Sequence, residues 1–232
     1  MKTIRGIEYQ AGSKEENLPY DTPDFPYLAS RAELNSYPEP FAPWHWHNAI
    51  ELFYMKSGRL NYYTPHKNLV FPAGSAGMVN ANVLHKTQVL TRAEDNIQLL
   101  HIFDPLLLAG SHGSLIEQKY ISPIVTASQI ELIALSPDEP EQAAIIDLIR
   151  SAFTLSEQEP GYEFKIREAL SRILIELFQM CAPLLKERSQ AGQIADDKVK
   201  GMMVYVHEHY AEKISVRELA SAVFLSEREC YR

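Results

Sequence analysis

The sequence predicts an α+β protein: a β-barrel, then a pair of helices, then the beginning of a helix-turn-helix. Short β-branched and aromatic segments alternate with Pro, Gly and Asn over about residues 20–135. Helical apolar stripes follow, and two helix-capping sequences stand near the C-terminal end. We therefore expect a ligand-sensing barrel at 1–135, a helical pair at 136–188, a small polar linker at 189–197 and a partial helix-turn-helix at 198–232.

The composition is that of a globular protein with an acidic balance. Of 232 residues, 46% are hydrophobic and 22% are charged, which is enough apolar material for a sizeable core. The formal net charge of −8 excludes a protein that works only through a broad basic groove on nucleic acid. Any contact with DNA must come from a local element.

The cysteines and the N-terminus indicate the compartment. Cys181 and Cys230 are far apart and form no CxxC pair, which favours a reducing environment over a disulfide framework. The N-terminal stretch has no apolar core of a signal peptide. No apolar run approaches the ~20 residues that span a bilayer. We expect a cytoplasmic protein with no membrane partner.

The first zone carries the strands of the expected barrel. Turn-like sequences at 56–59 and 64–67 separate its segments, and this close spacing is typical of a sandwich or barrel. The expected strands are Ile50–Met55, Leu60–Tyr63, Asn68–Phe71, Ala76–Asn80, Ile97–Phe103 and Ile121–Thr126.

Two helices are expected after the barrel. Ser136 followed by Pro137 and two acids predicts a helix start, and Pro160-Gly161 predicts its break. The apolar stripe of the second helix is Ile166, Leu170, Ile173, Leu174, Leu177 and Cys181. The short break suggests an antiparallel pair. Two interpretations stay open: the pair packs on the barrel, or its second stripe forms a dimer seam.

The densest chemistry lies between Trp44 and Glu51. In a regular strand His45 and His47 point to the same side, and Glu51 keeps that parity. Two imidazoles and a carboxylate on one face are the ingredients of a facial-triad metal site. His85, on a later strand, is a fourth candidate.

This pattern resembles a known motif. His-x-His, three residues, Glu, six residues and Gly58 resemble the first cupin motif, and Pro72-Ala73-Gly74 with His85 resembles a loosened second motif. The resemblance implies a jelly-roll barrel over about residues 20–130. It also implies that His45, His47, Glu51 and His85 face its interior.

Three roles compete for these four residues. They ligate Fe, Mn, Ni or Zn; they hydrogen-bond a polar effector; or they satisfy one another in the core. The aromatic residues near the site could wall a sugar or aromatic ligand. These are Trp44, Trp46, Phe53 and Tyr62. His101 is expected to be a buried structural histidine, whereas His66 and His112 are expected in solvent.

The C-terminal residues predict capped helices. Ser215 with Glu218, and Ser226 with Glu229, are two capping boxes. The first box begins a helix over Val216–Val223, and a helical stripe over Lys198–Tyr210 precedes it. Two capped helices separated by a short turn are typical of a helix-turn-helix.

The string VYVHEHYAEKISVRELASAVFLSERECYR resembles the first helix-turn-helix of AraC-type regulators. The resemblance implies DNA as a partner, a small-molecule effector and a homodimer. It places Arg228, Tyr231 and Arg232 on the groove-facing side. The family has a second motif after a long helix, so we expect this sequence to be truncated within the first motif.

These observations predict a ligand-responsive, sequence-specific transcription regulator rather than an enzyme. A small metabolite, with a sugar as first guess, would bind His45, His47, Glu51, His85, Trp46, Phe53 and Tyr62. No cofactor is required in this interpretation, although a divalent metal fits the same four polar residues. The alternative is a metal-dependent cupin enzyme, such as a dioxygenase or isomerase.

Overall fold

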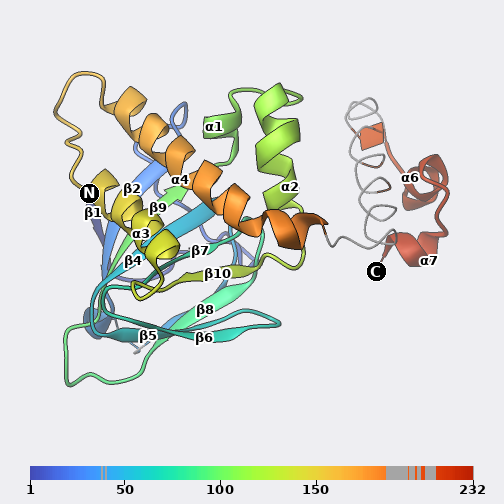
Figure 1. Ribbon diagram of the computed structural model, residues 1–232. Helices are drawn as coiled ribbons and strands as arrows, with labels where there is room; N and C mark the ends of the chain where they lie inside the picture. Colours follow the sequence, from blue (N-terminus) through green and yellow to red (C-terminus); the bar gives the residue numbers. More distant parts are fainter. Residues whose placement is uncertain are drawn as a thin grey trace. The chain divides into compact units, whose positions relative to one another are not determined.

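The computed structural model describes residues 1–37, 39, 41–186, 198, 202, 205, 206 and 213–231 (Figure 1). Two compact units make up the chain, Met1–Ala182 and Pro183–Arg232. The expected linker at 189–197, most of the expected helix over Lys198–Tyr210, and Arg232 lie outside the described residues. None of the described helices is long and apolar enough to cross a membrane.

The first unit is built on a jelly roll. Its larger sheet has the order β1 (Lys2–Ile4), β2 (Tyr27–Glu33), β9 (Ile97–Phe103), β4 (Ile50–Ser57), β7 (Ala76–Val79) and β10 (Leu132–Leu135). Its smaller sheet has the order β3 (Phe41–His45), β8 (His85–Val89), β5 (Arg59–Tyr63) and β6 (Asn68–Pro72). Strands β2 to β9 therefore form two four-stranded layers, 2-9-4-7 and 3-8-5-6, which is the jelly-roll order. The predicted barrel is confirmed.

The expected strands are confirmed except for the last one. The prediction of a strand over Ile121–Thr126 is wrong, because the chain there forms a short π-helix, η2 (Glu117–Ile121), and then α2 (Ser122–Val125). Pro123 lies in the first turn of α2, where a helix tolerates proline. Ile121 and Ile124 are both buried at a helical spacing of three.

Alternation along the central strands separates two apolar layers. On β4, Glu51 and Phe53 belong to the barrel interior, and Leu52 points to the other face of the sheet. On β9, Leu100 pairs with Phe53 on the inside, and His101 pairs with Leu52 on the outside. Both faces are covered, so these strands are buried almost throughout.

Two helices cover the outer face of the larger sheet: α3 (Pro140–Ala152) and α4 (Tyr162–Lys186) (Figure 1). The predicted stripe of α4 is confirmed, since all six of its residues are buried. The predicted start of α3 at Ser136 is wrong. The Ser136 hydroxyl instead accepts a hydrogen bond from the Asp138 amide in a turn, and Pro140 begins the helix.

His101 joins the sheet to α3. Its Nε2–H donates to the carbonyl of Ile149 (3.3 Å), because a carbonyl can only accept, and its Nδ1 then accepts from the hydroxyl of Tyr27 (2.7 Å). The ring also stacks on Phe153 with centroids 3.6 Å apart. Burial lowers the pKa of His101 to about 3, so the residue is a neutral, fully bonded structural histidine, as expected.

The second unit contains α6 (Val216–Ala222) and α7 (Glu227–Cys230). Both predicted capping boxes are confirmed: the Glu218 amide donates to Ser215 Oγ (3.2 Å) and the Glu229 amide to Ser226 Oγ (3.3 Å). Helix α6 ends one residue before the expected Val223. The connecting turn passes through Phe224 at φ 57°, a left-handed conformation that lets α7 start in a new direction.

Gly77 is required by the packing of the barrel. A Cβ atom there would lie 2.5 Å from Cζ of Phe53 and 2.6 Å from the carbonyl oxygen of Ile133. We therefore expect Gly77→Ala to lower the free energy of unfolding by about 1–3 kcal/mol in urea denaturation. Gly6→Ala is the control, since a Cβ there meets nothing within 4 Å. Equal urea midpoints for Gly77→Ala and the wild type would contradict this packing.

The neutral state of His101 predicts acid sensitivity. The unfolded chain binds a proton at this residue below its ordinary pKa of 6.5, whereas the folded protein does so only near pH 3. Stability contributed by His101 is therefore lost as pH falls through this window, by up to about 1.4 kcal/mol per pH unit. We expect the pH dependence of the unfolding free energy between pH 6.5 and 4 to be shallower in His101→Gln. Parallel curves for the two proteins would refute this assignment.

Candidate functional site

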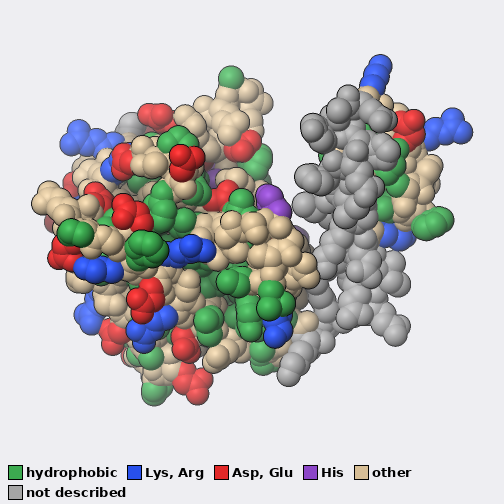
Figure 2. Space-filling view, turned by 90° about the horizontal axis from the view of Figure 1, so that it is seen from above, with side chains coloured by type: hydrophobic (Ala, Val, Ile, Leu, Met, Phe, Trp, Pro, Cys, Tyr) green, Lys and Arg blue, Asp and Glu red, His purple; other side chains and the backbone are tan. Residues whose placement is uncertain are grey.

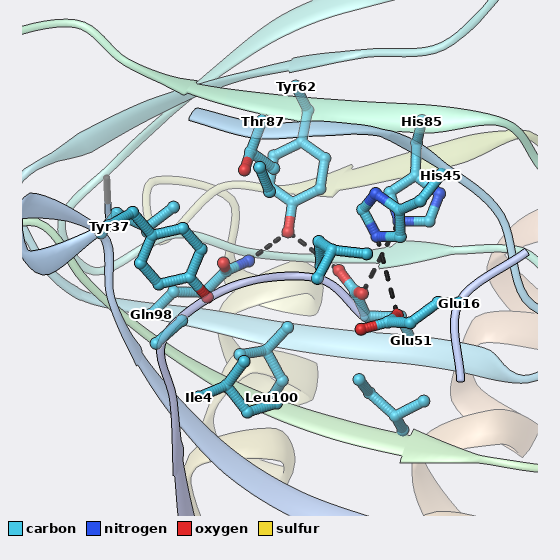
Figure 3. Close-up of a pocket in the computed structure, with 15 residues that line it drawn as sticks. Ile4, Glu16, Tyr37, His45, Glu51, Tyr62, His85, Thr87, Gln98 and Leu100 are labelled. Carbon is cyan, nitrogen blue, oxygen red and sulfur yellow. Dashed lines mark hydrogen bonds and ion pairs between the residues drawn. The ribbon is translucent and has the colours of Figure 1, made fainter. Parts of the chain in front are cut away.

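The motif residues lie where the chain passes from one sheet to the other. Strand β3 ends at His45 and β4 begins at Ile50, so no single regular strand runs from Trp44 to Glu51, and strand parity does not place Glu51 beside the histidines. His45 closes β3, His47 lies in the connection, Glu51 is on β4, and His85 opens β8 opposite His45. His45, Glu51 and His85 nevertheless converge at the cavity inside the barrel (Figure 3), and the buried His47 places its Nε2 3.6 Å from the Glu51 carboxylate.

The three imidazoles form a tight buried cluster. Ring centroids are 4.1 Å apart for His45 and His85, 5.2 Å for His47 and His85, and 6.1 Å for His45 and His47. One ring nitrogen from each residue lies within 4.8 Å of the other two. This spacing suits ligands of a single metal ion.

Backbone carbonyls set the tautomer of each ring. Nδ1 of His45 lies 2.7 Å from the Pro43 carbonyl, Nδ1 of His47 lies 2.9 Å from that of Ala49, and Nδ1 of His85 lies 2.8 Å from that of Val83. A carbonyl oxygen can only accept a hydrogen bond, so Nδ1 of every ring carries the hydrogen. In a neutral ring Nε2 is then unprotonated and offers a lone pair. Nε2 of His47 and of His85 is buried with no hydrogen-bond partner among the described residues.

Glu51 adds a carboxylate to these lone pairs. One oxygen accepts from the Tyr62 hydroxyl (2.9 Å), which in turn accepts from the Gln98 amide. The other oxygen lies 3.6 Å from His47 Nε2 and 3.8 Å from His85 Nε2, too far for hydrogen bonds. Burial alone would raise the pKa of Glu51, but the two imidazoles outweigh it and hold that pKa well below its usual range.

The sequence prediction missed Glu16, which approaches from the N-terminal segment. The backbone there pairs with the motif strand: the Glu16 amide donates to the Trp46 carbonyl (2.8 Å), and the Trp46 amide donates to the Lys14 carbonyl (3.1 Å). This places the Glu16 carboxylate 3.8 Å from His45 Nε2, with the side chain only 6% exposed. Burial raises the pKa of Glu16 to about 7. No spacing in residues 1–20 marks this residue; only the tertiary pairing reveals it.

The site attracts a cation. Burial and the neighbouring His85 lower the pKa of His45 to about 3. Burial also opposes a charge on His47, but the Glu51 carboxylate outweighs it and raises the pKa of His47. A proton on His47 is therefore one positive charge that can balance the negative charge of Glu51. A metal ion would engage all three Nε2 lone pairs, and ligands about 2.1 Å from one ion lie roughly 3–3.5 Å apart. The Glu51 oxygen lies 3.6 Å from His47 Nε2 and 3.8 Å from His85 Nε2, and the three histidine nitrogens lie within 4.8 Å of one another.

The cavity beside these groups is small. Its volume is about 30 Å³, and apolar side chains including Ile4, Leu34 and Leu100 line the part away from the histidines. This space holds about two water molecules, far less than the roughly 300 Å³ of ordinary small-molecule pockets. In this conformation the cavity has no room for a sugar.

The predicted aromatic residues divide into two groups. Tyr62 lines the cavity, and Phe53 stacks behind it with centroids 4.4 Å apart. Trp46 does not line the cavity; it is half-buried, and its backbone holds the N-terminal segment. The two histidines expected in solvent are exposed, His66 beside Glu131 and His112 beside Glu117.

Two of the three predicted DNA-contacting residues can be placed. Arg228 and Tyr231 are both exposed and stand three positions apart at α7, so they share a face. Arg232 lies outside the described residues. Figure 2 shows acidic and basic side chains interspersed over the visible face of the barrel unit, with no continuous basic patch there.

Comparison with known proteins gives one sequence relative and several partial structural similarities. No family model matches the chain. The uncharacterized HTH-type transcriptional regulator YdeC of Bacillus subtilis (strain 168) is 22% identical over 223 residues, covering 94% of this chain and 73% of that protein.

Among solved structures, an RmlC-like cupin from Shewanella frigidimarina is 16% identical and covers 34% of this chain and 68% of its own, with a TM-score of 0.30. The cupin domain of Cnp3 from Schizosaccharomyces pombe is 14% identical and covers 38% of this chain and 63% of its own, with a TM-score of 0.32. The strand order of this chain, rather than these overlaps, establishes the jelly roll.

The hydrogen bonds of the Tyr62 hydroxyl should contribute measurably to the free energy of unfolding. Tyr62→Phe keeps the stack on Phe53 but leaves buried Glu51 and Gln98 each without a partner. We expect a loss of about 1–3 kcal/mol in the free energy of unfolding. Tyr120→Phe, at an exposed ring on the same unit, should change it by less than about 0.5 kcal/mol. A neutral Tyr62→Phe would show that the hydroxyl does not bridge these groups.

Proposed function

We propose that this chain is a DNA-binding transcription regulator of the AraC type whose barrel binds a small ligand. The observation that carries the proposal is the similarity to an HTH-type regulator along 94% of the chain, which spans both the jelly roll and the capped helices. The two capping boxes support it, because they define a helix, a turn and a second helix start.

The DNA contact in this proposal is local. Arg228 and Tyr231 at α7 would approach the groove, where arginine pairs with guanine or phosphate. The described residues 213–231 carry equal numbers of basic and acidic side chains, Lys213, Arg217 and Arg228 against Glu218, Glu227 and Glu229. Contacts of defined geometry, rather than bulk charge, would therefore supply the recognition.

The sensing site is the polar end of the barrel cavity. His45, His47 and His85 fit a divalent cation because their ring nitrogens converge, and Nε2 of His47 and of His85 has no hydrogen-bond partner among the described residues. The Glu51 carboxylate lies 3.6 and 3.8 Å from these two Nε2 atoms. Such an ion, when bound, would act as a Lewis acid for an oxygen ligand. The protein holds each imidazole through Nδ1 and positions Glu51 through Tyr62.

A homodimer completes this proposal. Phe164 and Ile175 are exposed on α4, 81% and 47%, and stand eleven residues apart, which is three helical turns. They lie away from the buried stripe and would be two apolar contacts in a dimer seam, with Glu168 and Ser171 between them on the same side of α4. Ligand binding would act by favouring one dimer arrangement over another.

A metal-dependent enzyme, such as a dioxygenase or isomerase, is the second candidate. The buried three-histidine, one-carboxylate set favours it, since catalytic metal sites use the same donors. The helix-turn-helix elements favour the regulator. An activity screen of metal-loaded protein against small carboxylates and sugars separates the two.

Selection of random duplex DNA by the chain tests the regulator. We expect enrichment of a defined sequence, and Arg228→Ala should weaken binding to it by about tenfold or more, as loss of a base contact does. Arg172→Ala, an exposed arginine on α4, is the control and should leave binding unchanged. Failure to enrich any sequence above the input pool would contradict sequence-specific binding.

A further inference from the structure

The cavity has a second carboxylate that the cupin-like motif does not supply. Glu16 comes from the N-terminal segment, outside the jelly-roll strands, and it lines the same cavity as His45, Glu51 and His85 (Figure 3). Its backbone is fixed by the hydrogen bond to Trp46. Its carboxylate is buried, and the group it faces is His45 Nε2 at 3.8 Å.

The groups that face the cavity include many hydrogen-bond acceptors and few donors. In their neutral state the three rings offer only lone pairs to the cavity, because their hydrogens lie on Nδ1. Glu51 and Glu16 add two carboxylates, and among the residues that the structure describes only Glu51 accepts a side-chain hydrogen bond, from the Tyr62 hydroxyl. Buried acceptors that face one another need hydrogens or a positive charge between them, and a divalent cation would supply that charge to all of them at once.

We propose that Glu16 is a fifth ligand of a divalent cation that His45, His47, His85 and Glu51 hold. This inference rests on the cation site in the proposed function and extends it. Three imidazoles and two carboxylates are a mixed N and O set that suits Mn, Fe, Co or Zn. Five protein ligands leave at most one position of an octahedral ion for water or a small anion, and the cavity of about 30 Å³ has room for such a small ligand.

The number of open coordination positions indicates what the bound ion can do. Catalytic metal sites keep coordination positions open for substrate, whereas structural sites are closed by protein ligands. With Glu16 as a ligand, nearly all coordination positions of the ion are occupied by protein groups. Such a site favours a sensory or structural ion over a catalytic one. The barrel would then respond to the cation itself, or to a cation with one very small ligand.

Cobalt binding provides a readout that needs no enzymatic activity. We would titrate the chelator-treated full chain with Co²⁺ and record both the dissociation constant and the visible absorption spectrum. Glu16→Gln should raise the dissociation constant by roughly 10–100-fold, as loss of a group that supports a metal does. Its absorption bands should also change, because one ligand is lost. Glu15→Gln, at the half-buried neighbour, should match the wild type in both measurements.

The possible outcomes separate the claims. If Glu16→Gln binds Co²⁺ with wild-type affinity and spectrum while His47→Ala loses binding, the cation site stands and the role of Glu16 is refuted. If the wild type binds no divalent ion, the cation site fails together with this inference, and the DNA selection still decides the regulator independently. Unfolding midpoints measured in chelator check that Glu16→Gln folds. The Gln side chain keeps an amide oxygen that can still coordinate the ion, whereas Ala has none, so Glu16→Ala should lose more Co²⁺ affinity than Glu16→Gln.

Discussion

Three hydrogen bonds from imidazole Nδ1 atoms to backbone carbonyls decide what this barrel can bind. They fix the hydrogen on the outer nitrogen of His45, His47 and His85, so that the inner nitrogens meet as lone pairs. With the hydrogens reversed, each Nδ1 lone pair would face a carbonyl oxygen at 2.7–2.9 Å, which is repulsive. As built, the interior attracts a cation.

The jelly roll explains how such a cluster forms from one short stretch of chain. Strands β3 and β4 belong to different sheets, so the connection between them crosses the barrel and brings residues of both sheets to its end. The pairing of β3 with β8 adds His85 directly opposite His45. The N-terminal segment then closes over the cluster by pairing with Trp46, and it brings Glu16 with it.

The sequence predicted the motif residues but not all of their surroundings. Spacing identified His45, His47 and Glu51, and the resemblance to the cupin motifs implied that these residues and His85 face the barrel interior. Glu16 could not be found this way, since its place depends on pairing with a segment thirty residues along the chain. Trp46 was misjudged for a related reason: aromatic character says nothing about which side of an irregular connection a ring occupies.

The outer layer shows the same contrast between local and tertiary signals. The capping boxes at Ser215 and Ser226 follow from local geometry and were predictable. The start of α3 was not, because Ser136 and Pro140 offer competing starts and packing on the sheet selects between them. The segment over Ile121–Thr126 has the composition of a strand, yet burial of Ile121 and Ile124 on one side of a helix outweighs that preference.

The central strands connect the cavity with the helices by the shortest physical path. Leu100 of β9 faces the cavity, while the next residue, His101, bonds the carbonyl of Ile149 on α3. Glu51 of β4 likewise precedes Leu52, which packs on the outside of the sheet. Because close-packed layers transmit small displacements rather than absorb them, any change in the spacing of β4 and β9 would reach α3 through these adjacent pairs. In the proposed sensor, the coupling from the cavity to the helices would therefore depend on two strands that are buried on both faces.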